Sequence, residues 1–314
     1  QEACRSGLAS GDFLYAAYGA STESWPAIVS CQNLGECVRS LEPNLALVVQ
    51  LRNTAFADVL RMVMAWARAL QGRTAAPLAL SHSEGEGFDE AAYAQTYCDN
   101  PFFSMFHAIA RLHIGYLQGD APQALAAVMA VRRSAHQLTG MIWSVLFDVW
   151  GSLTLAACIE HAADAQQRDD WLAQMRESLA SLAVLAQSCA VNFRCHWLLL
   201  GAELERIGGR NDAALDRYEQ AIAQADDAAD VQQQALANEL FATFWLARGN
   251  RGIAGRRVVV DRYRDDLTVD HVRQHVAARD DLDLVPPAVA AEVRFDGRCW
   301  RGCDRRDARR AVAG

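Results

Sequence analysis

Apolar residues recur every three or four positions along most of the chain, which is the spacing that places side chains on one face of an α-helix. In the clearest run, residues 54–70, they stand at Leu60, Val63, Met64, Ala67 and Leu70. The strict alternation that marks a β-strand is almost absent, and β-branched Val258–Val260 lies inside a helical pattern. The pattern therefore predicts an all-α fold.

Turn and capping signals divide this pattern into separate helices. Gly72 ends one run, and Pro26 and Pro43 are expected at the starts of theirs, because proline lacks the N–H that a helix interior uses. Residues 73–87, which include Pro77, are predicted to form an exposed, mobile loop. The expected helices are 24–31, 34–41, 44–52, 54–70, 88–98, 101–118, 141–162, 168–190 and 269–278, with two further hairpins inside 192–257.

A glycine recurs between helices, and an alanine follows it five residues later. Glycine takes the left-handed conformation that ends a helix, and a small side chain lets two helices approach closely. The recurrence of this spacing is typical of a repeat built from helical hairpins. The pairs are Gly11 and Ala16, Gly119 and Ala124, Gly209 and Ala214, and Gly249 and Ala254.

This spacing resembles that of tetratricopeptide repeats. With Gly209 as the turn glycine, the small and aromatic positions of that repeat fall at Ala202, Ala214, Tyr218 and Ala221. The resemblance implies an α-solenoid of tetratricopeptide-like hairpins, wound as a right-handed superhelix.

A closer resemblance is carried by CAVNFRCHWLLLGAELERIGGR, YEQAIAQA and ALANELFATFWLARGN, with SGDFLYAAYGA near the start. These segments are similar to the helical region of large bacterial multidomain sensor kinases. In that family a serine/threonine-kinase-like domain and an AAA-type ATPase precede a tetratricopeptide-like region, and GAF and histidine-kinase domains follow it. The resemblance implies a solenoid over 1–267 and a helix and linker toward a GAF-type domain over 268–297. Residues 298–314 are rich in Arg and Cys and show no periodicity, so an irregular tail is expected there.

The resemblance implies no catalytic residue, because the family's ATP-binding and phospho-acceptor motifs lie outside this stretch of it. The first helix of each hairpin lines the concave groove of such a solenoid. When the chain is matched to the repeat pattern at its turn glycines, the groove positions fall at His196, Glu203, Arg206, Glu239, Thr243, Phe106, His113 and Tyr116. The groove would hold a peptide, a neighbouring domain or a small effector. The alternative is that Glu203 and Arg206, three residues apart, form a local ion pair that supports the helix packing.

Charge and composition exclude some types of catalytic site and one class of partner. All 30 basic residues are arginines, so no Walker A lysine, kinase strand lysine or Schiff base is available. The formal net charge is −8, and residues 291–314 hold seven arginines against four acidic residues, a net +3 that leaves −11 for residues 1–290. We expect no nucleic-acid partner, because the phosphate backbone binds basic surfaces and residues 1–290 are acidic.

No cofactor, membrane span or secretory leader is expected. The longest apolar runs are interrupted by Arg, Asp or Gly, and no basic-then-apolar leader begins the chain. The nine cysteines include no CxxC pair and are expected to be reduced, mostly buried thiols of a cytoplasmic protein.

One acidic segment matches a known metal-binding motif. Asp226, Asp227 and Asp230 fit the DDxxD motif with which terpene synthases hold magnesium, and Asn211–Glu219 nearly fits their second motif. The motifs stand in the wrong order and in one hairpin, which favours an acidic loop between helices. Two further pairs lack a nearby third ligand and carry no metal prediction: His271 with His275, and Cys299 with Cys303.

The expected function is a non-catalytic sensing or docking segment that relays the state of an ATPase module to a GAF and histidine-kinase output. A second hypothesis is the ligand-sensing solenoid of an ATPase-type transcription regulator, in which a helix-turn-helix domain would follow residue 314. A third, an all-α metal-dependent lyase, requires magnesium at the DDxxD aspartates.

Overall fold

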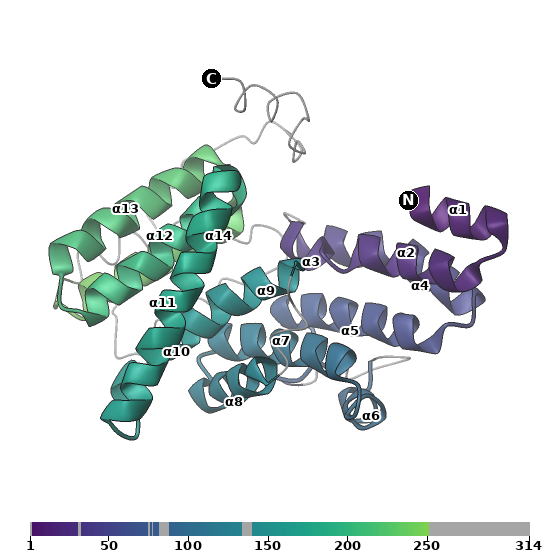
Figure 1. Cartoon of the computed structure of the whole chain (residues 1–314), viewed down its shortest axis with the longest axis horizontal. Helices are drawn as coiled ribbons and strands as arrows, with labels where there is room; N and C mark the ends of the chain where they lie inside the picture. The colour runs from purple at the N-terminus through teal and green to yellow at the C-terminus, as the bar shows by residue number, and fades with distance from the viewer. Residues whose placement is uncertain are drawn as a thin grey trace. The chain divides into compact units, whose positions relative to one another are not determined.

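The computed structural model describes residues 2–30, 33–74, 76, 78–81, 88–133 and 140–250, and these ranges contain helices and no strand. The all-α prediction is therefore confirmed for the described chain (Figure 1). The proposed linker and tail, both histidine and cysteine pairs, and the boundary at residue 267 lie outside the described residues.

Figure 1 shows the helices in chain order. Their bounds are α1 Glu2–Ser10, α2 Phe13–Ser24, α3 Ala27–Ser30, α4 Leu34–Gln50, α5 Thr54–Leu70, α6 Glu90–Thr96, α7 Pro101–Leu117, α8 Ala121–Arg132, α9 Ile142–Leu146, the π-helical turn η2 Phe147–Gly151, α10 Ser152–Cys158, the 3-10 turn η3 Ile159–His161, α11 Ala165–Ser188, α12 Ala190–Ile207, α13 Asn211–Asp227 and α14 Val231–Leu246.

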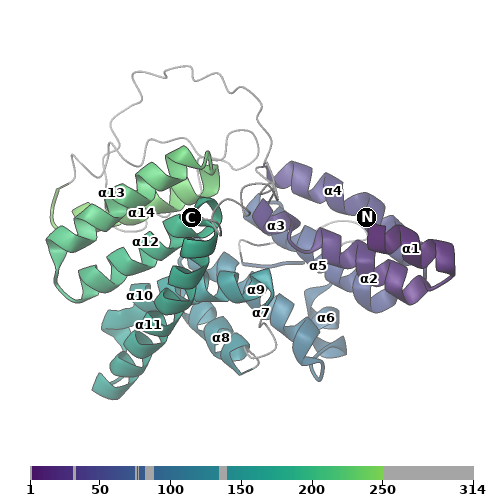
Figure 2. The same ribbon diagram turned by 45° about the horizontal axis from the view of Figure 1, so that its top comes forward.

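Helices adjacent in sequence pack as hairpins, in the pairs α1/α2, α4/α5, α7/α8, α11/α12, α12/α13 and α13/α14. Successive hairpins also touch, since α2 contacts α4 and α5, α5 contacts α7, and α10 contacts α8, α11 and α12. Figure 2 shows α12, α13 and α14 side by side in a second orientation. Contacts are thus mostly between neighbours along the chain.

The predicted hairpin turns have the expected backbone. Gly11, Gly119 and Gly209 have φ of 75°, 70° and 75°, in the left-handed region where a Cβ is strained. The alanines five residues after them, Ala16, Ala124 and Ala214, are at most 1% exposed. Gly249 has a φ of 74°, but Ala254 lies outside the described residues.

Side chains preceding the helices explain where most of them begin. An Asp or Asn accepts a hydrogen bond from a backbone N–H of the first turn, which satisfies one of the donors that a helix start leaves free. The capping residues are Asp12, Asn33, Asn53, Asp89, Asn100, Asp120, Asp164 and Asp230.

Two predicted helix boundaries are wrong. Pro43 does not open a helix but lies inside α4, where the apolar face from Leu34 to Val48 packs against α5 and α2 and outweighs one lost backbone hydrogen bond. Residues 24–31 are not one helix either. Instead α2 ends at Ser24, and the short α3 starts at Ala27.

The apolar segment predicted as one helix over 141–162 is broken into α9, η2, α10 and η3. By length and composition, Ile142–His161 is able to cross a membrane, and 67% of its most apolar stretch is buried inside the structure. A buried core helix has the same composition, and this segment contacts α7, α8, α11 and α12.

The cysteines in the described ranges are free thiols. Cys4, Cys37, Cys158 and Cys195 are buried, Cys189 is half-buried, and Cys98 is exposed. Their pattern agrees with the expectation of reduced, mostly buried side chains.

Candidate functional site

Two of the predicted groove residues belong to a polar network between three helices. Arg206 donates from Nε and Nη2 to Glu203 Oε2, at 2.9 and 2.7 Å, and from Nη2 to the Ala156 carbonyl of α10 at 3.2 Å. Tyr218 of α13 donates its hydroxyl to the other oxygen of Glu203. One carboxylate on α12 therefore joins α10, α12 and α13.

Burial makes this network electrostatically strong. Glu203 is 4% exposed and Tyr218 is fully buried. Burial, followed by the charge and hydrogen bond of Glu203, raises the pKa of Tyr218 well above its usual range. Burial alone would lower the pKa of Arg206, but the charge of Glu203 outweighs it and raises that pKa. The phenol stays protonated and the guanidinium stays charged, and the expected local ion pair between Glu203 and Arg206 is confirmed.

The other predicted groove residues of this region lie on α12 and α14. His196 is half-buried, its Nδ1 has no partner among the described residues, and burial lowers its pKa against the opposing charge of Asp230. Glu239 and Thr243 are half-buried, and the Thr243 hydroxyl donates to the Glu239 carbonyl at 2.9 Å.

The three predicted groove residues of α7 are packed against aromatic side chains. Phe106 is fully buried, with its ring centroid 4.8 Å from that of Trp143. His113 is 9% exposed and stacks on Trp150 at 4.1 Å, and burial lowers its pKa to about 3. Phe106 and His113 thus lie in the core and not on an open surface, because the segment after α8 covers them.

Tyr116 is the α7 residue that remains half-buried, with its ring 5.4 Å from that of Trp150. It is also near enough to α13 for its phenol to add, after burial and Glu203, to the upward shift in the pKa of Tyr218.

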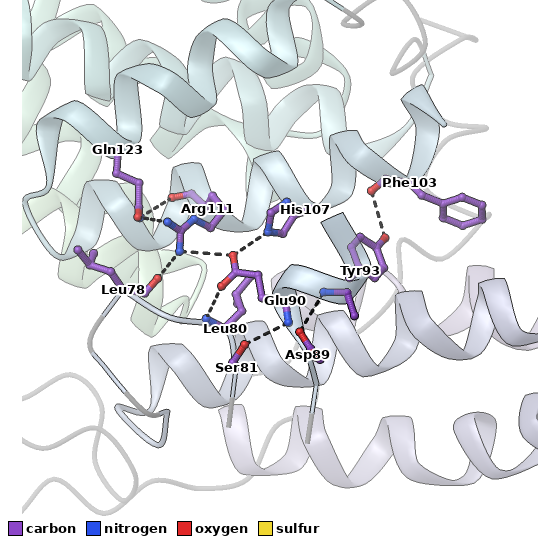
Figure 3. Close-up of polar contacts among 11 residues, drawn as sticks. Leu78, Leu80, Ser81, Asp89, Glu90, Tyr93, Phe103, His107, Arg111 and Gln123 are labelled. Carbon is purple, nitrogen blue, oxygen red and sulfur yellow. Dashed lines mark hydrogen bonds and ion pairs between the residues drawn. The ribbon is translucent and has the colours of Figure 1, made fainter. Parts of the chain in front are cut away.

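A second polar cluster, centred on Glu90 at the start of α6, was not predicted (Figure 3). Glu90 Oε1 lies 2.7 Å from His107 Nε2 and 3.4 Å from Arg111 Nη1, both on α7. Its other oxygen, Oε2, accepts the Leu80 amide at 3.1 Å. Burial would raise the pKa of Glu90, but the bonds from His107 and Leu80 and the charge of Arg111 outweigh burial and lower it.

The same cluster binds the segment before α6. The Glu90 amide donates to Ser81 Oγ at 3.1 Å, and Arg111 donates to the Leu78 carbonyl (Figure 3). Leu80 is fully buried. The prediction of an exposed loop over 73–87 is therefore wrong at residues 78–81, while residues 75, 77 and 82–87 lie outside the described chain.

The Glu90 cluster holds α6, α7 and the segment before α6 together. Both carboxylate oxygens are occupied by donors, and Arg111 is held in turn by Gln123 of α8 (Figure 3). One signal was present in the sequence, because His107 and Arg111 are four residues apart on one helix face. Their carboxylate partner, Glu90, lies on another helix, so the spacing of residues along α7 does not indicate it.

The DDxxD aspartates lie at the α13–α14 junction. Asp230 caps α14, where its Oδ1 accepts the Gln233 amide at 2.9 Å and its Oδ2 accepts the Gln233 side chain at 2.7 Å. Asp226 accepts from Gln234. These contacts agree with the interpretation of an acidic connection between two helices.

No family model matches this chain, and no curated protein or solved structure matches it. The resemblances to tetratricopeptide repeats and to sensor kinases therefore depend on the sequence segments quoted above.

Proposed function

We propose that residues 1–267 form a right-handed α-solenoid of tetratricopeptide-like hairpins. It serves as a non-catalytic docking and sensing segment within a multidomain bacterial signalling ATPase or kinase. Its partner is a protein or a neighbouring domain of the same polypeptide.

The proposal is carried by the recurrence of one structural unit. Three left-handed glycine turns are each followed, five residues later, by a buried alanine. Successive hairpins contact their neighbours. Repeats of this kind build extended surfaces that bind other chains.

The polar chemistry of the described helices supports a non-catalytic role. Glu203 and Glu90, the carboxylates of the two networks, have both oxygens occupied by donors from neighbouring helices or loop backbone. Both carboxylates join neighbouring segments of the chain, which agrees with a positioning role. The proposed docking surface is the part of α14 that carries Glu239 and Thr243, both half-buried.

The first test is the reading frame beyond residue 314. A GAF domain and a histidine-kinase region there support the proposal. A helix-turn-helix domain there overturns it in favour of a transcription regulator.

The second test is binding between this chain and the separately produced adjoining domain, measured by isothermal titration calorimetry. We expect Glu239→Ala with Thr243→Ala to weaken binding by about tenfold, the loss of roughly 1.4 kcal/mol. Glu219→Ala, which removes an exposed carboxylate of α13, is the matched control and should bind as the parent chain does. Equal affinities for both variants would contradict docking at this surface.

A further inference from the structure

A cleft of about 400 Å³ lies between α11, α12 and the start of α13. Four arginines line it against one glutamate, an excess of three positive charges in a chain whose net charge is −8. A cleft of this size accommodates a small organic molecule. Its charge is opposite to that of the protein as a whole.

One wall of the cleft is a stripe along α11. Arg168, Leu172, Arg176 and Leu179 stand at spacings of four, four and three residues, so they share one helix face. Arg168 is half-buried and Arg176 is exposed, and neither forms an ion pair with another described residue. Their charges are available to a ligand.

The opposite wall holds two arginines in place. The Arg217 guanidinium lies over the Trp197 ring at 5.5 Å and has its Nε 3.9 Å from Glu205 Oε1. Arg210 pairs with the other oxygen of the same carboxylate. A Cβ on Gly201 would overlap Arg217, so the glycine leaves the space that this guanidinium occupies. The single negative charge of Glu205 is therefore shared between the two positive charges of Arg210 and Arg217 and balances only one of them.

Helix stability does not account for these arginines. Arg168 lies in the first turn of α11, and Arg210 stands at the N-cap of α13. The helix macrodipole disfavours positive charge at both places. Among the residues that line the cleft, Glu205 is the one acidic side chain, so the four arginines are only partly neutralised there.

The rest of the lining is apolar. Leu172 is 7% exposed, and Leu179, Leu204 and Ile207 complete this part of the wall. A bare inorganic anion would leave these side chains without a contact. A ligand with an apolar group next to its charge would cover them and add the free energy of apolar burial.

We propose that this cleft binds a small organic phosphate, with the phosphate held by Arg168 and Arg176 and the apolar group against the leucines. Guanidinium groups match phosphate oxygens in pairs and stay charged at all physiological pH values. The site is separate from the proposed docking surface on α14, so either assignment stands if the other fails.

The test is titration calorimetry of the purified chain with phenyl phosphate, inorganic phosphate and phenol at constant ionic strength. We expect phenyl phosphate to bind about tenfold more tightly than inorganic phosphate, and phenol not to bind at up to about 10 mM. Equal affinities for phenyl phosphate and phosphate would overturn the role of the apolar wall. Equal affinities for phenyl phosphate and phenol would overturn the role of the arginines.

The variant Arg168→Gln with Arg176→Gln should weaken phenyl phosphate binding by about tenfold or more. Arg194→Gln, which removes an exposed arginine of α12 outside the cleft, is the matched control and should change the affinity less than about twofold. Far-UV circular dichroism confirms that both variants are folded. Failure of the parent chain to bind phenyl phosphate, or equal losses in both variants, would refute the site.

Discussion

Replacing Arg206 with methionine leaves the Glu203 carboxylate without its countercharge. The Glu203 side chain is 5% exposed, and Arg206 supplies two of its three hydrogen bonds, with Tyr218 supplying the third. Breaking one side of a buried ion pair costs about 3–5 kcal/mol. The Arg206 side chain is itself 27% exposed, so we expect the lower end, about 3 kcal/mol, for Arg206→Met.

The decisive comparison is the effect of Glu203→Gln in two backgrounds. In the parent chain it removes an ion pair and should lower the free energy of unfolding by about 1–2 kcal/mol. In the Arg206→Met background it removes a buried charge that has lost its partner. It should therefore raise the free energy of unfolding by about 1 kcal/mol, because an amide is less costly to bury than a carboxylate.

The assay is equilibrium unfolding in guanidinium chloride, followed by far-UV circular dichroism and tryptophan fluorescence. Arg194→Met, an exposed substitution on the same helix, should change the free energy of unfolding by less than about 0.5 kcal/mol. If Glu203→Gln lowers stability equally in both backgrounds, Arg206 does not neutralise Glu203 and the reasoning is refuted.

Three further predictions concern single positions. Gly209→Ala should lower the free energy of unfolding by about 1–2 kcal/mol in chemical denaturation, because Gly209 has a φ of 75°, and no loss would refute the turn. Burial lowers the pKa of His113 from 6.5 to about 3, so between these values the unfolded chain binds a proton that the folded chain does not. As the pH decreases through this range, the free energy of unfolding should therefore decrease by up to about 1.4 kcal/mol per pH unit. Urea titrations of His113→Phe should not show this contribution. Glu90→Gln should speed hydrogen exchange at the Leu80 amide, and an unchanged rate would contradict the attachment of that segment.

The features that the sequence predicted well depend on a few neighbouring residues. The left-handed turns follow from the steric freedom of glycine, and residues 54–70 form a helix with those same bounds because the preceding Asn53 caps it and Gly72 ends it. These effects act within one or two helical turns. A single sequence displays them directly.

Two of the predicted groove residues are buried, because their exposure depends on a segment farther along the chain. Phe106 and His113 occupy positions of α7 that the repeat pattern leaves open, but Trp143 and Trp150 of the following segment cover them. That segment contains a π-helical turn, which periodicity does not indicate. Likewise, the carboxylate that joins His107 and Arg111 lies on another helix, where sequence spacing gives no signal.

The two saturated clusters show how this protein uses arginine to fasten helices. In each, an arginine binds a mostly buried carboxylate and also donates to a backbone carbonyl of another segment. Arg111 binds Glu90 and the Leu78 carbonyl, and Arg206 binds Glu203 and the Ala156 carbonyl.

The α11 arginines of the cleft lack this arrangement. Neither Arg168 nor Arg176 has a carboxylate or carbonyl partner among the described residues, although lysine is absent and arginine is the chain's sole permanent cation. Exposed arginines elsewhere, such as Arg194, also lack such a partner, so the absence of a partner does not by itself indicate a site. The proposal depends on the position of Arg168 and Arg176 in one cleft with an apolar wall, where an organic anion would find both charge and apolar contact.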